Sequence, residues 1–213
     1  MKEGKISFGE KFRDVTYSAG AIFPWTYGGV LRRNIADGTV LDMGCGKAWA
    51  WRRFIDKSRR QRFHSTGVDI SDTYLEYCRK HKMYDEIVCG DVTKLGFADK
   101  SYDVVLLLQI LSHLPKEKGL EILEHAERIA RKQVIIGTEN EIVDIPGKDH
   151  VSAWSPAELS RMGYKVTGYG FKPFDINGHD SGLAVNISRF TALFPFTYNK
   201  PEKAYQMLGI KNL

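Results

Sequence analysis

The chain has 213 residues, 43% of them hydrophobic, and a formal net charge of +5. This length and composition suit a single domain with a sizeable core. No apolar run approaches the roughly 20 residues that cross a bilayer, and the first residues lack the apolar core of a signal peptide, so we expect a soluble, cytoplasmic protein. The cysteines Cys45, Cys78 and Cys89 are odd in number and have no Cys-x-x-Cys spacing, which argues against a disulfide framework and a thiolate zinc site.

Short apolar runs rich in β-branched residues alternate with helical patterns, which is typical of an α/β fold with a parallel sheet. Residues 102–108 are almost continuously apolar, as expected of a central strand that is buried on both faces. The expected strands cover 39–42, 65–69, 86–89, 102–108, 133–137, 164–171 and finally 205–211, for which 183–187 is the alternative. The expected helices cover 23–34, 48–55, 71–81, 116–130 and 156–162.

Helix-start signals and an exposed sheet edge refine this outline. Ser71 is the expected N-cap of its helix, and Ser155, Pro156 and Glu158 form a capping sequence with proline at the first helical position. The sheet should have seven strands, mostly parallel, with one antiparallel strand near the C-terminus that covers the edge beside the fifth strand. We expect one domain with an N-terminal helical cap over 1–36, a cofactor-binding core over 37–140 and a C-terminal completion over 141–213.

A glycine-rich segment, residues 42–46, joins the first core strand to a helix, where backbone can approach a ligand closely. A P-loop would need glycine where Leu41 stands and a hydroxyl where Ala48 stands. A dinucleotide fingerprint would need a third glycine for close packing of helix on strand, but Trp49 occupies that position. Neither phosphate-binding pattern therefore fits.

Acidic residues follow the next two strands. Asp69 ends the second strand, about 20 residues after the glycine loop, where ribose hydroxyls of an adenosine cofactor are commonly held. Together with Asp91 after the third strand and the segment 101–114, this series resembles the motifs of class I S-adenosylmethionine-dependent methyltransferases. One departure is Ala48, which stands where the family has a third glycine. We expect its single methyl group to cost little at the start of a helix.

The resemblance implies a Rossmann-like class I methyltransferase fold, S-adenosyl-L-methionine as cofactor and methyl transfer as activity. It also implies roles for particular residues. Asp42 and the backbone of Gly44, Cys45 and Gly46 would contact the methionine part of the cofactor. Asp69 would bind the ribose.

The same resemblance assigns residues to the adenine ring and to the sulfonium of the cofactor. Asp91 would meet the adenine ring, which Ile70 and Val92 would sandwich. Gln109, with Leu108, would border the sulfonium. The alternatives are that Asp91 is a turn residue after a strand and that Gln109 is a solvated loop side chain.

His113 is the candidate catalytic base. Methyl transfer from a sulfonium is a direct displacement, so much of the acceleration can come from aligning the acceptor, the methyl carbon and the sulfur. A base is needed only when the acceptor has a proton that must leave early. His113 follows the fourth strand at the mouth of the expected site, although a structural role is the alternative.

The residues after the fourth strand argue against several acceptors. The chain lacks the Asp/Asn-Pro-Pro-Tyr motif of enzymes that methylate exocyclic amines of bases, and it has no Cys beside Pro as in cytosine-C5 enzymes. Gln109 offers an amide where catechol-type enzymes hold magnesium with carboxylates, so we expect no metal. These residues leave a small-molecule acceptor as the favoured prediction. The alternatives are an RNA methyltransferase, or a domain of this fold that binds RNA or protein without catalysis.

A basic cluster precedes the second strand. It leads into the start of that strand, at the edge opposite the one where open α/β sheets bind ligands, so we expect a solvated loop and consider nucleic acid a less favoured partner. Its members are Arg52, Arg53, Lys57, Arg59, Arg60 and Arg62.

The segment 149–156 resembles one in small uncharacterised methyltransferases that are linked to small-molecule, lipid or glycan modification. In such enzymes the N-terminal helix and insertions near the last strands cover the acceptor. The corresponding covering residues would be Tyr17, Trp25, Tyr27, His150, Trp154 and the aromatic stretch 190–198. The alternative is that these aromatic side chains close the core.

Overall fold

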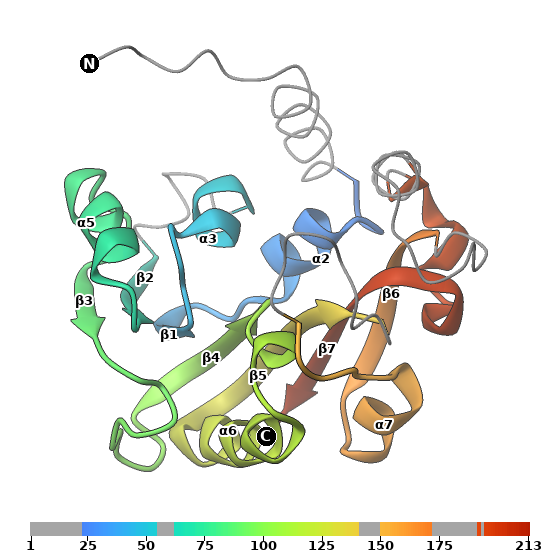
Figure 1. Cartoon of the computed structure of the whole chain (residues 1–213). Coiled ribbons are helices and arrows are strands. Elements are labelled where there is room, and N and C mark those ends of the chain that lie inside the picture. The colour runs from blue at the N-terminus through green and yellow to red at the C-terminus, as the bar shows by residue number, and fades with distance from the viewer. Residues whose placement is uncertain (1–22, 55–61, 141–149, 172–190, 193) are drawn as a thin grey trace.

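The computed structural model describes residues 23–54, 62–140, 150–171, 191–192 and 194–213. They form a seven-stranded sheet in the order β3-β2-β1-β4-β5-β7-β6 (Figure 1). The strands are β1 (Gly38–Met43), β2 (Phe63–Asp69), β3 (Glu86–Cys89), β4 (Tyr102–Leu108), β5 (Ala130–Glu139), β6 (Lys165–Phe171) and β7 (Ala204–Asn212). The first five are parallel, and β7 runs antiparallel between β5 and β6. The predicted mixed sheet is confirmed.

Helices cover both faces of this sheet, as Figure 1 shows. One face carries α2 (Tyr27–Asn34), α3 (Trp49–Phe54) and α5 (Asp72–Lys80), and the other carries α6 (Lys116–Ile129) and α7 (Pro156–Arg161). Short 3-10 helices in the described residues are Leu111–His113, Pro195–Thr197 and Pro201–Lys203. In the part of the chain that the structure describes, no helix is long and apolar enough to cross a membrane.

The structure places Ser155 and Ser71 at the predicted N-caps and moves the start of one other helix. The Ser155 side chain accepts from the Glu158 N–H, as predicted for α7. Ser71 stands at the N-cap of α5, but its side chain makes no capping bond, and its backbone N–H donates to Asp69. The first described helix begins three residues later than Pro24, since extended Thr26 caps it by accepting from the Gly29 N–H at 3.1 Å.

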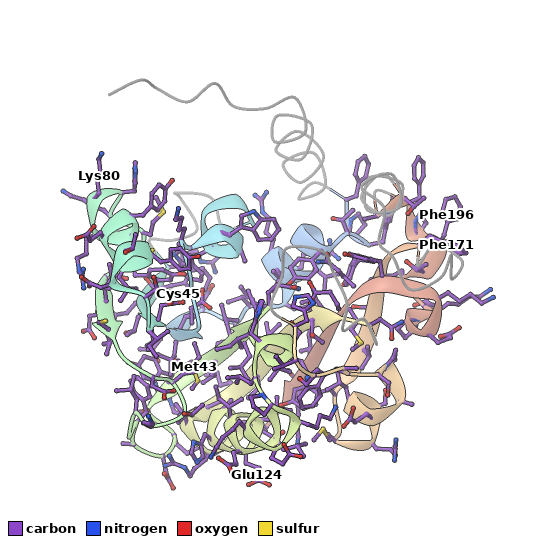
Figure 2. The ribbon with its side chains drawn as sticks, viewed as in Figure 1. Met43, Cys45, Lys80, Glu124, Phe171 and Phe196 are labelled. Atoms are coloured by element: carbon purple, nitrogen blue, oxygen red, sulfur yellow. The ribbon has the colours of Figure 1, made fainter. Side chains whose placement is uncertain are left out.

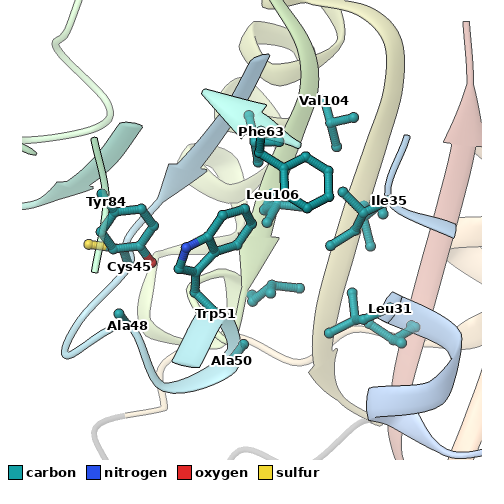
Figure 3. Close-up of a cluster of buried hydrophobic side chains, with 14 of the residues drawn as sticks. Leu31, Ile35, Cys45, Ala48, Ala50, Trp51, Phe63, Tyr84, Val104 and Leu106 are labelled. Carbon is teal, nitrogen blue, oxygen red and sulfur yellow. The ribbon is translucent and has the colours of Figure 1, made fainter. Parts of the chain in front are cut away.

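Two large aromatic side chains anchor the core on opposite faces of the sheet. Trp51 is 1% exposed, stacks on Tyr84 and packs against Phe63 (Figure 3). Trp154, also 1% exposed, packs against α6, where a Cβ at Gly119 would lie 2.4 Å from its ring. Trp154 is therefore a core residue, and its predicted role as a cover over the acceptor is wrong.

The structure describes some of the other residues that were predicted to cover the acceptor, and others lie outside it. Tyr27 is buried against Tyr169, which supports the alternative that it closes the core. Tyr17, Phe190 and the alternative last strand over 183–187 lie outside the described residues. Of the basic cluster, the structure describes only the side chain of Arg62, which forms an ion pair with Asp37.

Candidate functional site

The carboxyl ends of β1, β2 and β4 surround a cavity of about 760 Å³. This volume lies within the range of about 300–1,000 Å³ that small-molecule sites occupy. Every residue proposed from the sequence for cofactor binding or catalysis lines it: Asp42, Gly44, Cys45, Gly46, Asp69, Ile70, Asp91, Val92, Gln109 and His113. Lys47, Tyr74 and Lys118 also line the cavity and were missed.

The glycine loop turns sharply away from β1. Gly44 and Gly46 have φ angles of +75° and +53°, which glycine adopts without steric cost. The loop is tied to β2, because the N–H groups of Gly44 and Cys45 both donate to the Val68 carbonyl, at 2.8 and 2.9 Å. A Cβ built on Gly46 would meet no atom within 4 Å, so the loop faces open space that a ligand can fill.

Ala48 contradicts the expectation that its methyl group costs little. Its φ is +54°, a left-handed conformation that costs an L-residue about 1–2 kcal/mol. The family's glycine at this position would adopt it freely. Ala48 is fully buried just before α3, so the chain accepts backbone strain here to keep the turn.

Asp69 holds the loop as well as facing the cavity. Its Oδ2 accepts from the Gly46 N–H at 2.8 Å, and its Oδ1 accepts from the Ser71 N–H at 2.9 Å. Each carboxylate oxygen has capacity for a second hydrogen bond, so ribose hydroxyls can still bind. The structural role was not visible in the sequence, because the bond to Gly46 spans 23 residues.

Asp42 is a buried carboxyl group at the end of β1, with 3% exposure. The Tyr84 hydroxyl donates to its Oδ2 at 2.6 Å. Burial raises the pKa of Asp42 to about 6, the bond from Tyr84 lowers it, and the Asp69 carboxylate raises it further. Tyr84 reaches this position because Gly67 has no side chain, and a Cβ there would lie 2.5 Å from the ring.

Asp91 has the turn role that its alternative predicted. It accepts from the backbone N–H and the hydroxyl of Thr93, at 3.0 and 2.7 Å, and forms an ion pair with Lys94. These bonds, led by those from Thr93, lower the pKa of Asp91. Beside it, Val92 is buried while Ile70 is 72% exposed, which leaves an apolar wall for a flat ring to cover.

The opposite end of the cavity is supported by a carboxylate that the sequence analysis missed. Glu139 ends β5 and is 1% exposed. With its amide nitrogen turned toward Glu139, Gln109 donates to both carboxylate oxygens, at 2.6 and 3.1 Å, and the Ser112 hydroxyl donates at 3.2 Å. These bonds hold the Gln109 side chain in place, so the solvated-loop alternative is wrong.

Two histidines lie next to this carboxylate. His113 ends the 3-10 helix after β4 and faces the cavity, while His150 is buried behind it. Their ring centroids are 4.8 Å apart, and His150 Nε2 lies 4.0 Å from Glu139 Oε2. An acidic residue at the end of a fifth strand is a usable sequence signal, but the strand was predicted to end at Gly137.

These features together define a class of protein. A glycine loop after β1 and an acidic residue at the end of β2 share one edge of a sheet in which β7, the last strand along the described chain, is antiparallel. This is the architecture of class I methyltransferases, and the open face over Gly46 fits their adenosyl cofactor.

Comparison with known proteins agrees with this architecture. Residues 40–133 match the family described as methyltransferase domain. The chain is 27% identical over 164 residues to a probable S-adenosylmethionine-dependent methyltransferase of Mycolicibacterium smegmatis, a match that covers 72% of this chain and 60% of the relative. The chain thus spans less than two thirds of that relative's length. Residues 40–133 are thus similar to the methyltransferase domain family, and the fold around them is that of class I methyltransferases.

Solved structures show the same fold. Magnesium protoporphyrin IX methyltransferase of Synechocystis with bound SAH has a TM-score of 0.59 and 17% identity, covering 99% of this chain and 90% of that one. A small RNA methyltransferase has a TM-score of 0.59 and 14% identity, covering 99% of this chain and 26% of that one. Their acceptors differ, so the shared fold does not identify the acceptor of this chain.

Proposed function

We propose that this chain transfers a methyl group from S-adenosylmethionine to a small-molecule acceptor. The observation that carries the proposal is the single cavity in which the residues at the ends of β1, β2, β3 and β4 meet. The cofactor supplies a methyl group activated on a sulfonium, and the protein supplies binding, alignment and exclusion of water.

The loop end of the cavity suits the cofactor. Gly46 leaves room for its methionine part, and buried Asp42 offers a negative charge to its ammonium group. Asp69 lies beside the same loop and accepts from the ribose hydroxyls in this proposal. Ile70 and Val92 provide the apolar walls for adenine.

The opposite end of the cavity suits a small acceptor. It is lined by Ile110, Leu114, Gln109 and His113, with Lys118 as a cation. Recognition of a nucleic-acid backbone relies mainly on many phosphate contacts, which this mixed apolar and polar set does not provide. Glu139 fixes Gln109 from behind, so the polar wall at this end is rigid.

His113 is the group that accepts a proton from the acceptor in this proposal. It is exposed to the cavity and has no need to move for access. An acceptor that ionises by itself would not require this step. The proton would leave through the cavity mouth, where His113 meets solvent.

The experiment is a transfer assay with methyl-labelled S-adenosylmethionine. The full chain is incubated with a pooled metabolite extract and, separately, with total RNA, and the label is followed into each fraction. Label in small molecules supports the proposal, and label in RNA alone overturns the small-molecule acceptor. A Gly46→Val protein serves as the control, because it should transfer to neither.

A further inference from the structure

Two thiols meet beneath the glycine loop. Cys45 belongs to the loop and Cys78 to α5, and both thiols donate to the Gly46 carbonyl, at 3.7 and 3.4 Å. Each thiol also shifts the pKa of the other, so the two lie close together. Figure 2 shows Cys45 inside the molecule and Lys80, at the end of α5, on its surface. A pair of cysteines in such contact can form a disulfide through rotation of the side chains.

Access to this pair runs through the cofactor cavity. Cys45 is 8% exposed and lines the cavity, whereas Cys78 is fully buried behind it. Among the described residues, the cavity therefore offers a small oxidant its path to Cys45. A ligand over Gly44–Gly46 would cover that approach.

We propose that Cys45 and Cys78 are an oxidation site at which hydrogen peroxide forms an intramolecular disulfide when the cofactor cavity is empty, and that this disulfide lowers cofactor affinity. The proposal rests on the proposed cofactor site. By linkage, a disulfide that weakens cofactor binding is itself disfavoured by bound cofactor to the same extent.

The chemistry balances with one peroxide molecule. The Cys45 sulfur attacks a peroxide oxygen, the O–O bond breaks, and the leaving hydroxide takes up the thiol proton to form water. The Cys78 sulfur then attacks the resulting sulfenic acid, the S–O bond breaks, and the second hydroxide leaves as water with the Cys78 proton. Two thiols lose two electrons, and peroxide gains them.

The surroundings favour a slow, selective reaction. The hydrogen bond to Cys78, burial and the Asp42 carboxylate raise the pKa of Cys45, while the same bond lowers the pKa of Cys78. The thiolate is the reactive form, so oxidation needs sustained exposure to peroxide.

The disulfide would change the loop. A sulfur–sulfur bond of about 2.05 Å draws Cys45 toward α5 and removes both thiol donors from the Gly46 carbonyl. The Gly46 N–H is held at the same time by Asp69. We therefore expect the loop to shift and the affinity for S-adenosylhomocysteine to fall at least tenfold.

The experiment uses the full chain with Cys89→Ser, which removes the exposed third thiol. The protein is treated with hydrogen peroxide, with and without S-adenosylhomocysteine, then alkylated, digested and analysed by mass spectrometry, and its affinity for S-adenosylhomocysteine is measured by calorimetry. We expect a peptide pair linked through Cys45 and Cys78 without ligand, protection with ligand, and full recovery of affinity after reduction.

Matched variants separate the possible failures. Cys78→Ala and Cys78→Ser should give no linked peptide, because no disulfide can form, so any loss of affinity they show after peroxide reports oxidation of Cys45 alone. An absent linked peptide, or a linked peptide formed equally with bound ligand, overturns the oxidation site. A reduced protein that does not bind S-adenosylhomocysteine overturns the proposed cofactor site instead, and the linked peptide is still detectable in that case.

Discussion

Replacing Asp42 by Asn should stabilise the protein while weakening cofactor binding. Burial raises the pKa of Asp42 from 3.8 to about 6. Above both values the carboxyl group is ionised in the folded and unfolded states, and the folded state bears the cost of its burial. As the pH falls from about 6 toward 3.8, the folded state takes up the proton first and this cost disappears.

The magnitude follows from the shift. Each pKa unit corresponds to about 1.36 kcal/mol, so a rise from 3.8 to about 6 destabilises the folded state by about 3 kcal/mol near neutral pH. Asn retains an oxygen that accepts from Tyr84, but it buries an amide with new hydrogen-bonding needs. We therefore expect Asp42→Asn to gain about 1–3 kcal/mol of unfolding free energy.

Urea unfolding at about pH 7.5 and about pH 5 measures this gain, and it should shrink at the lower pH. Calorimetry at the higher pH should show affinity for S-adenosylmethionine reduced about tenfold or more, because the negative charge facing its ammonium group is lost. Tyr84→Phe is the control, since loss of its bond raises the pKa of Asp42 further and should destabilise the protein. An Asp42→Asn protein that is folded but less stable at both pH values would refute this reasoning.

Four other substitutions test separate parts of the site and fold. Gly46→Val should abolish binding of S-adenosylhomocysteine in calorimetry and cost about 1–2 kcal/mol of stability through its left-handed φ; unchanged affinity in a folded variant would place the ligand elsewhere. Asp69→Ala should weaken S-adenosylhomocysteine binding about 10- to 100-fold, because ribose and loop bonds are both lost, and full affinity would remove its assigned role. His113→Ala should keep affinity within about twofold yet lower turnover about 10²-fold once an acceptor is known; a merely structural His113 would instead lower the melting temperature. Ser155→Ala should lower the unfolding free energy by about 1 kcal/mol, measured in urea, without changing S-adenosylhomocysteine affinity.

The sequence predicted the sheet well because strand signals are local. The buried run of β4 and the bounds of β3 can be read from a few consecutive residues. Parallel strands end at one edge, so residues that follow them, such as Asp69 and Asp91, could be grouped before their contacts were known. The antiparallel β7 followed from the need to cover the free edge of β5.

What the sequence did not predict depends on contacts between distant segments. Tyr84 bonds to Asp42 across 42 positions, and Ser112 bonds to Glu139 across 27. No periodicity links such pairs. Trp154 illustrates the same limit, because its burial against Gly119 is set by how α6 packs on the sheet.

The sequence pattern also did not predict the backbone conformation of Ala48. Ala48 matches the motif in size, yet its left-handed φ depends on the turn into α3, which an aligned motif does not specify. Pattern reasoning therefore treated the methyl group as harmless where the turn strains it.

The most direct test of the cofactor site is a crystal structure of the full chain with S-adenosylhomocysteine. The ligand should lie over Gly44–Gly46, with its ribose hydroxyls within hydrogen-bond distance of the Asp69 carboxylate and its adenine between Ile70 and Val92. A ligand bound outside this cavity, or a ribose that makes no contact with Asp69, would contradict the assignment.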